Sequence, residues 1–162
     1  MAKGKMFDVK KEVPSLALCR KLKELGYPQE GGGWYWVKTK TIGKETWRVG
    51  FQVKREDSYG RMHIDYQSEF SIPDIEVEEV VKAPTCRELG EWLPWYLPEL
   101  KFLNAERNED GFHYCYNEET FNGCYIIADT EPNARAKMLI WLVENGYLCF
   151  EKEDKENKEE IK

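Results

Sequence analysis

The amino-acid sequence of 162 residues has no long hydrophobic run. Its longest uninterrupted apolar stretch is MLIWLV at residues 138–143, whereas a membrane-spanning helix needs roughly 18 apolar residues. The N-terminal MAKGKMFDVKKEV also lacks the apolar core and the small-residue cleavage site of a secretion signal. We therefore predict a cytoplasmic protein that has no membrane span and no export signal.

Cysteine and histidine are scarce, with five cysteines at irregular spacings and two histidines. An odd number of cysteines without a C-x-x-C pair fits a reduced compartment better than a disulfide framework. If the hairpin over residues 112–128 turns near its middle, Cys115 lies opposite Cys124 with His113 nearby, as in a zinc site. The simpler interpretation places the histidines on the solvent side and the thiols in the core, so we predict no metal and no cofactor.

Catalytic and phosphate-binding motifs are missing as well. No G-x-S-x-G or Ser-x-x-Lys pattern occurs, and GGGWYW at residues 31–36 lacks the Lys-Ser/Thr of a P-loop. Cys86 begins a predicted helix whose dipole could lower its pKa, but a small first-turn residue is the simpler interpretation. The acidic DIEVEE at residues 74–79 is typical of a solvated surface. We therefore predict a protein that is not an enzyme.

The chain has no excess of positive charge, since its net charge at pH 7 is -6. This balance opposes nucleic-acid binding, which depends on neutralisation of phosphates by Lys and Arg. The tail EKEDKENKEEIK at residues 151–162 has too few apolar residues to offset the entropy of ordering, so we expect it to be disordered. Residues 1–150 are predicted to form one domain, with a surface suited to basic partners.

The sequence is rich in aromatic residues, with 6 Trp, 9 Tyr and 7 Phe. Alternating patterns predict strands over residues 34–40, 45–54, 61–66, 100–107, 112–117 and 123–129. Residues 67–82 fit either a strand or a helix, and we favour extended structure. Helices are predicted over residues 15–25 and 85–93, the second with a Thr85/Glu88 capping box. Together with a last helix they predict an α+β fold: a mainly antiparallel sheet of about five or six strands with three helices packed on it.

The last helix, in DTEPNARAKMLIWLVENGYL, is the clearest element. Thr130 is a good N-cap, Pro132 is tolerated in the first turn, and Gly146 ends the helix. At about 100° per residue, the apolar side chains of residues 138–143 point in nearly every direction. Such a helix needs cover on two sides, by the sheet and by a second helix, the WLPWYL segment or another subunit.

Three blocks of the chain, SLALCRKLKELG, CRELGEWLP and DTEPNARAKMLIWLVENGYL, resemble a family of small uncharacterised proteins of tailed phages and prophages. The blocks occur in the same order and cover about a third of the chain. This resemblance implies expression inside an infected or lysogenic bacterial cell. It implies no catalytic or binding residue.

Two functional hypotheses follow. The first is a non-enzymatic phage or prophage accessory protein that binds a host or phage protein and forms a homo-oligomer, because Trp and Tyr concentrate binding energy. The candidate interaction residues are Trp92, Trp95, Tyr96, Ile140 and Trp141. The alternative is a counter-defence protein that binds a small molecule such as a nucleotide signal. The candidate residues for that site are Trp34, Trp36, Arg48 and Arg61, which would have to converge on a pocket.

Overall fold

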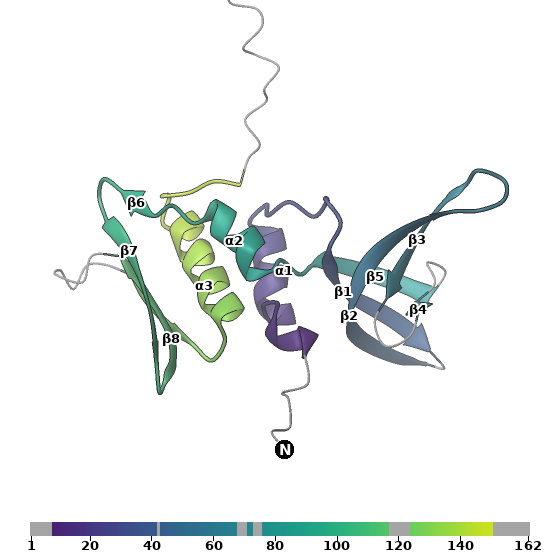
Figure 1. The fold of residues 1–162 in the computed structure, drawn as a ribbon, viewed down its shortest axis with the longest axis horizontal. Helices are drawn as coiled ribbons and strands as arrows, with labels where there is room; N and C mark the ends of the chain where they lie inside the picture. The colour runs from purple at the N-terminus through teal and green to yellow at the C-terminus, as the bar shows by residue number, and fades with distance from the viewer. Residues whose placement is uncertain (1–7, 42, 68–70, 73–75, 117–123, 151–162) are drawn as a thin grey trace, which may run out of the picture.

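Two antiparallel sheets lie at opposite ends of a layer of helices, which gives the molecule an elongated outline (Figure 1). The α+β class, the antiparallel strands and the three α-helices are as predicted, but the strands form two sheets, of five and four strands, rather than one sheet of about five or six. The predicted charged tail lies outside the described residues. The computed structural model describes residues 8–41, 43–67, 71–72, 76–116 and 124–150.

The first sheet contains five strands in the order β4-β3-β2-β1-β5, so four consecutive strands form a meander and the fifth returns to β1. Residues 67–82 include two of these strands, as the preference for extended structure predicted. Gly50 on β2 leaves room for Tyr66, whose Cβ would lie 2.9 Å from a methyl group at position 50. The strands are β1 (Trp34–Thr41), β2 (Lys44–Glu56), β3 (Met62–Gln67), β4 (Ser71–Ile72) and β5 (Val77–Lys82).

The second sheet contains four strands in the order β6-β7-β8-β9. Its central hairpin has the predicted turn, and Gly111 is required there because its φ is +128° and a Cβ would lie 2.3 Å from the carbonyl oxygen of Ala128. The strands are β6 (Tyr96–Leu97), β7 (Lys101–Asn108), β8 (Gly111–Tyr116) and β9 (Tyr125–Ala128).

The helices begin at the caps that the sequence predicts. Ser15 accepts a hydrogen bond from the backbone of Leu18, and Thr85 and Glu88 form the capping box. The helices are the 3-10 helix η1 (Val9–Lys11), α1 (Leu16–Glu24), α2 (Cys86–Trp92) and α3 (Glu131–Glu144). No helix within the described residues is long and apolar enough to cross a membrane.

Helix α3 is buried on two opposite sides. Ala134, Met138 and Leu142 pack with the inner face of the second sheet. Leu139 and Ile140 instead join Leu22 of α1 and Leu89 of α2 in a separate core cluster. Other parts of the same chain therefore cover α3: the second sheet on one side, and α1 and α2 on the other (Figure 1).

A buried ion pair joins the first sheet to the helices. Lys82 at the end of β5 is only 4% exposed, and its Nζ lies 3.2 Å from Oε1 of Glu88. The same ammonium group donates to the carbonyl oxygen of Gly32 and lies 5.0 Å from the ring centroid of Tyr35. The triple-glycine loop is thus a close-approach loop that wraps over Lys82, and Glu88 both caps α2 and pairs with that lysine.

A second polar network fixes α3 against α2 and β8. The guanidinium group of Arg135 donates to the carbonyl oxygen of Cys86 at 2.7 Å, to Glu131 at 2.8 Å and to the hydroxyl of Tyr114 at 3.1 Å. It passes beside Gly90, where a Cβ would lie 2.6 Å from Nη1 of Arg135. The absence of a side chain at position 90 therefore allows these hydrogen bonds.

Gly90→Ala tests this network. Alanine favours a helix by about 1 kcal/mol over glycine, yet its methyl group would displace the guanidinium group from its partners. We expect the substitution to lower the free energy of unfolding by about 1–2 kcal/mol in urea denaturation. In an Arg135→Met background the same change should stabilise the protein, by up to about 1 kcal/mol. The same sign in both backgrounds would contradict the role assigned to Gly90.

Candidate functional site

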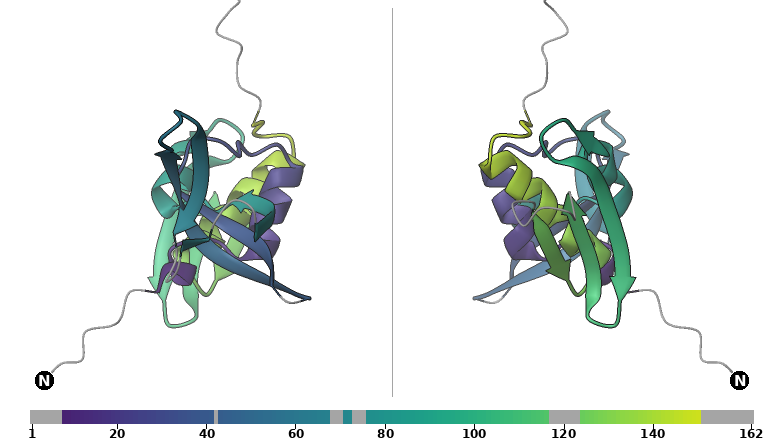
Figure 2. Two further views of the ribbon diagram at one scale, coloured as in Figure 1. Left: turned by 90° about the vertical axis from the view of Figure 1, so that its right-hand side faces the viewer. Right: turned by 90° about the vertical axis from the view of Figure 1, so that its left-hand side faces the viewer.

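The outer face of the second sheet carries the candidate site. In the sheet register, Leu103, Tyr114 and Ile126 share the face that packs on α3. The alternate residues point away from the helices. Figure 2 (right) views the sheet from this outer side, and none of the described helices lies over it. The outer residues are Phe102, Asn104, Glu106, His113, Cys115, Tyr125 and Ile127.

An aromatic cluster, formed by Trp95, Tyr96 and Phe102, extends this face at one end. The ring centroids lie 6.0 Å apart for Trp95 and Tyr96, 5.6 Å for Trp95 and Phe102, and 5.0 Å for Tyr96 and Phe102. The three residues are 73%, 40% and 54% exposed. The rings therefore contact one another while much of their surface stays in water.

Two further hydrophobic residues continue the surface along β9. Tyr125 is 59% exposed and Ile127 is 44% exposed. With the aromatic cluster they make five of the eight large hydrophobic residues that are exposed in the described part of the chain. At about 200 Å² for each large side chain, their exposed fractions amount to roughly 550 Å². The three rings in mutual contact account for roughly 330 Å² of this area, which lies within the range of about 300–600 Å² for the largest apolar patch of a monomer, and such patches are often functional.

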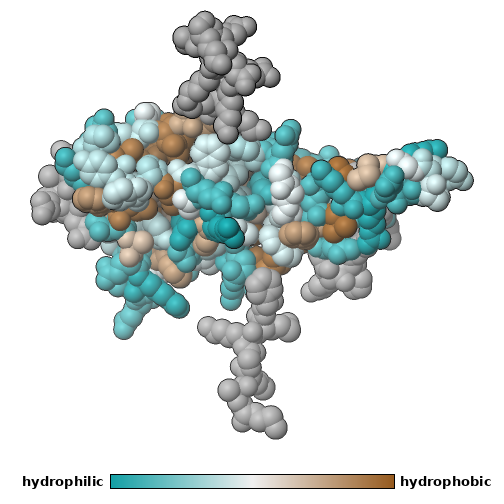
Figure 3. Space-filling view, turned by 45° about the horizontal axis from the view of Figure 1, so that its top comes forward, coloured by the Kyte–Doolittle hydropathy of each residue, from teal (hydrophilic) through white to brown (hydrophobic). Residues whose placement is uncertain are grey.

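Figure 3 shows that hydrophobic residues reach the surface over both ends of the molecule, between hydrophilic ones. At the end of the first sheet, the exposed large hydrophobics Phe51, Tyr59 and Met62 do not form a comparable cluster. Phe51 packs edge-on against Trp34, and Tyr59, which is 81% exposed, contacts no other aromatic ring in the described part of the chain and has only the guanidinium group of Arg61 beside it, 5.5 Å from its ring centroid. A cluster of exposed aromatic rings in mutual contact is thus found on the second sheet.

His113 is buried within this outer face. It is 7% exposed, and its Nδ1 contacts the hydroxyl of Tyr125 in a hydrogen bond. Its Nε2 has no hydrogen-bond partner among the described residues. His113 thus lies on the side of the sheet away from the helices, as predicted, but it is not exposed to solvent there, because Tyr125 of the neighbouring strand packs on its ring.

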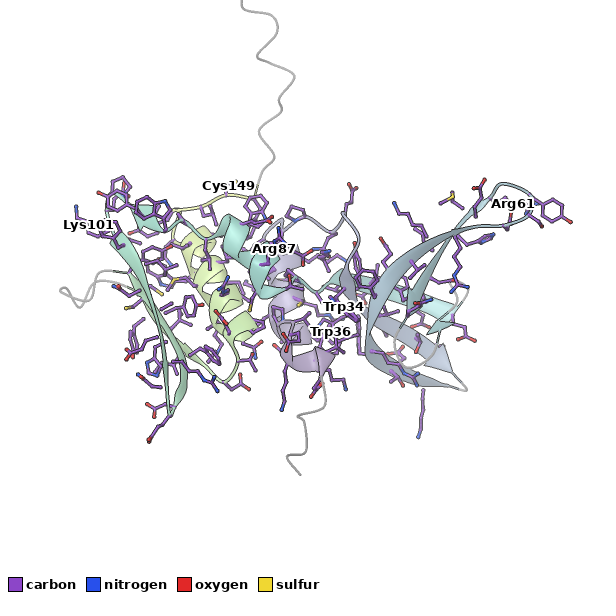
Figure 4. The ribbon with its side chains drawn as sticks, viewed as in Figure 1. Trp34, Trp36, Arg61, Arg87, Lys101 and Cys149 are labelled. Carbon is purple, nitrogen blue, oxygen red and sulfur yellow. The ribbon has the colours of Figure 1, made fainter. Side chains whose placement is uncertain are left out.

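The turn between β6 and β7 contains a residue other than glycine with a positive φ. Lys101 has a φ of +67°, a left-handed conformation that glycine adopts without strain and lysine does not. Figure 4 shows Lys101 beside a group of side-chain rings at this end of the molecule. A cation is thus held next to the aromatic cluster by a strained residue.

The predicted interaction residues divide into two groups. Trp95 and Tyr96 belong to the aromatic cluster. Trp92 instead packs against the rings of Tyr27 and Phe150, Ile140 is 9% exposed, and Trp141 stacks on Tyr147. Trp92, Ile140 and Trp141 therefore pack against other residues of the same chain around α3. Sequence reasoning missed Phe102, Tyr125 and Ile127, although apolar residues on both faces of YIIA were a usable signal.

The residues predicted for a small-molecule site do not converge. Trp34 and Trp36 pack on the side of the first sheet that faces α1, and Nε1 of Trp36 donates to the carbonyl oxygen of Pro14 at 3.0 Å. Arg48 lies opposite Val37 on the other face. Arg61 lies at the tip of the β2–β3 hairpin, far from the tryptophans (Figure 4).

A shallow cavity of about 600 Å³ lies beside the end of α1. No arginine lines it, so it lacks the combination of guanidinium groups and aromatic rings that a nucleotide signal would require. Its lining residues are Lys23, Gly26, Tyr27, Pro28, Gln29, Glu30 and Phe150.

The cysteine pairing assumed for a zinc site is wrong by one residue. Cys115 pairs with Tyr125 across the hairpin, and Cys124 joins the core cluster on the opposite face. Because neighbouring strand residues point to opposite sides, the sheet separates the two thiols. Within the described ranges, no group of three His, Cys, Asp or Glu residues is arranged to hold a metal ion.

Cys86 is not an activated thiol. Burial raises its pKa to about 11 because it disfavours the thiolate, and the carboxylate of Glu131 adds to this effect. The guanidinium group of Arg135 acts in the opposite direction but is outweighed. Burial thus opposes the activation that the start of the helix could provide.

The chain matches no family model, no curated protein and no solved structure.

Thiol labelling tests the assignment of the cysteines. At pH 8 we expect iodoacetamide to modify the exposed Cys149 well before Cys86 and Cys124, whose pKa values burial raises to about 11. Peptide mass spectrometry after timed quenching gives the rate at each site. Labelling of Cys86 as fast as that of Cys149 would revive a reactive role, and urea-unfolded protein serves as the control in which the rates converge.

Lys101→Gly tests the backbone strain at the β6–β7 turn. Glycine relieves the left-handed conformation but also gains entropy in the unfolded chain, so we expect a net stabilisation of up to about 1 kcal/mol. Lys101→Ala is the matched control, because it removes the same charge and keeps the strain. Thermal and urea unfolding measure both variants, and equal stabilities would show that the turn is unstrained.

Proposed function

We propose that this protein is a non-enzymatic binding protein that associates with another protein through the outer face of its second sheet. The single observation that carries the proposal is the exposed aromatic cluster, which shares the outer face of the second sheet with the exposed Tyr125 and Ile127. Trp and Tyr are the residues in which interfaces concentrate binding energy. A rigid sheet that presents them costs little ordering entropy when it binds.

The setting that we propose is a phage or prophage accessory role in the cytoplasm of a bacterial host cell, with a host or phage protein as the partner. The three blocks that resemble phage proteins coincide with α1, α2 and α3. They therefore form the helical layer that supports the sheet, whereas the candidate binding face lies on strands outside those blocks. On this proposal, relatives would share the scaffold and differ in the partner that they bind.

The alternative, a protein that binds a nucleotide signal, has less support. Its four candidate residues lie on different faces or at different ends of the molecule, and no arginine reaches the cavity beside α1. The exposed aromatic surface is also broad, which suits a protein partner better than a small ligand that needs enclosure.

Site-specific photo-cross-linking tests the binding proposal. A photoreactive phenylalanine analogue in place of Phe102 should give adducts of discrete mass in bacterial cells, because a bound protein would cover that position. The same analogue in place of Tyr59 is the control, since Tyr59 is 81% exposed and lies on the β2–β3 hairpin at the other end. Mass spectrometry of the adducts identifies the partner.

Two outcomes would contradict the proposal. Equal adduct patterns from positions 102 and 59 would indicate random collision, and an absence of discrete adducts from position 102 would indicate an unoccupied face. A further check is Trp95→Ala, which should reduce the adduct at position 102 without lowering the melting temperature, because Trp95 is 73% exposed.

A further inference from the structure

We propose that the partner binds the outer face by adding a strand of its own to β9, an edge strand of the second sheet. This inference rests on the proposed function and specifies the class of partner. That partner is a different protein with an extended, uncharged segment that has apolar side chains at alternate positions. The direction of the backbone groups of β9, the exposure of two of its side chains and the absence of charge on the strand support it.

The backbone of β9 has hydrogen-bonding groups that point away from the sheet. The backbone nitrogen of Tyr116 donates to the carbonyl oxygen of Cys124 at 3.2 Å, so these two residues form a hydrogen-bonded pair. Hydrogen-bonded and non-hydrogen-bonded pairs alternate along an antiparallel ladder. In the register of β8 with β9, the N–H and C=O groups of Tyr125 and Ile127 therefore point outwards.

Three of these four outward groups have no hydrogen-bond partner in the described part of the chain. They are the N–H groups of Tyr125 and Ile127 and the carbonyl group of Tyr125. The carbonyl oxygen of Ile127 accepts from Nζ of Lys137, at 3.4 Å and in an exposed position. Donors and acceptors that alternate along an edge in this way match the backbone of a further strand.

The outer side chains of β9 also have one uncovered side. His113 and Cys115 of β8 lie between two strands, and each is 7% exposed. Tyr125 and Ile127 share the same outer face but have a neighbouring strand on one side only, and they are 59% and 44% exposed. Apolar side chains of an added strand would lie directly beside them, where such cross-strand pairs stabilise a sheet.

An edge strand of the first sheet is closed by side chains. Oε1 of Gln29 accepts from the backbone nitrogen of Lys82 at 2.9 Å, and Nζ of Lys23 donates to the carbonyl oxygen of Val80 at 3.2 Å. Lys82 and Val80 belong to β5, which pairs with β1 on its other side. These contacts occupy backbone groups that a further strand would need.

The opposite edge of the second sheet carries charge instead. β6 covers the start of β7, and the exposed Glu106 and Arg107 lie on the remainder of that strand. Charged side chains on an edge strand disfavour pairing with another strand. The sequence of β9 is YIIA, which contains no charged residue. The second sheet therefore offers an uncharged edge at β9, and this favours an uncharged segment as its partner.

Photo-cross-linking from β9 tests the inference. The photoreactive phenylalanine analogue replaces Tyr125 in one variant and Ile127 in another. Both variants should form adducts with one segment of the same protein that position 102 reaches. Because residues two apart in a strand share a face, peptide mass spectrometry should find the two modified partner residues two positions apart.

Ile127→Pro tests the backbone contact. Proline has no N–H group, and an edge strand tolerates it where that group faces solvent. We expect about a tenfold loss of the adduct from position 102, because a carbonyl group of the partner loses its donor. Ile127→Val is the matched control, since it keeps the N–H group and has as many side-chain carbons as proline. It should keep most of the adduct.

Ala105→Pro makes the same change on the edge of β7. The backbone nitrogen of Leu103 donates to the carbonyl oxygen of Trp95, away from β8, so the N–H group of Ala105 two residues later points the same way. We expect this variant to leave the adduct from position 102 unchanged. Circular dichroism and melting temperatures confirm that each variant is folded.

The two proposals fail in different ways. A discrete adduct from position 102 that Ile127→Pro leaves unchanged, or partner residues far apart in sequence at positions 125 and 127, would overturn the added strand and keep the binding function. Loss of the adduct in Ala105→Pro alone would place the pairing on β7 and overturn the inference as well. Adducts that join two copies of this chain would overturn the assignment of a different protein. An absence of discrete adducts from position 102 would overturn both proposals.

Discussion

Burial of α3 on two sides is the constraint on which the rest of the structure depends. Its apolar side chains point in opposite directions, so a single layer of protein leaves one side in water. The second sheet covers Ala134, Met138 and Leu142, while α1 and α2 cover Leu139 and Ile140. This division places the helices between two sheets. It also leaves the second sheet with helices on one face only, and the aromatic surface lies on the other.

Polar contacts then hold the helices and the two sheets in place relative to one another. Arg135 joins α3 to both α2 and β8, and Gly90 provides the space that the guanidinium group needs. The ion pair between Lys82 and Glu88 likewise joins β5 to α2. Lys82 is buried, so removal of Glu88 would leave an uncompensated buried charge and would be strongly destabilising. The outer face is therefore presented by a scaffold with little freedom to rearrange.

Local signals made most of the elements predictable. Caps at Ser15, Thr85 and Thr130, together with alternation in the strands, gave correct helices and strands because these signals act within a few residues. They do not encode which strands pair, so two sheets were predicted as one.

The candidate site was partly predictable from the sequence. Pro94 ends α2 and Trp95 and Tyr96 follow it, but Phe102 becomes a neighbour of this segment only through the pairing of β6 with β7, and Tyr125 joins the same face only through the register of the second sheet.

The elongated arrangement of sheet, helices and sheet has a hydrodynamic consequence (Figure 1). An elongated particle experiences more friction than a sphere of equal mass, so its Stokes radius is larger than its chain length suggests for a compact domain. On a gel-filtration column calibrated with globular standards, even the single chain would elute early and resemble an assembly. The frictional ratio, rather than the elution volume, therefore separates the shape of this molecule from its stoichiometry.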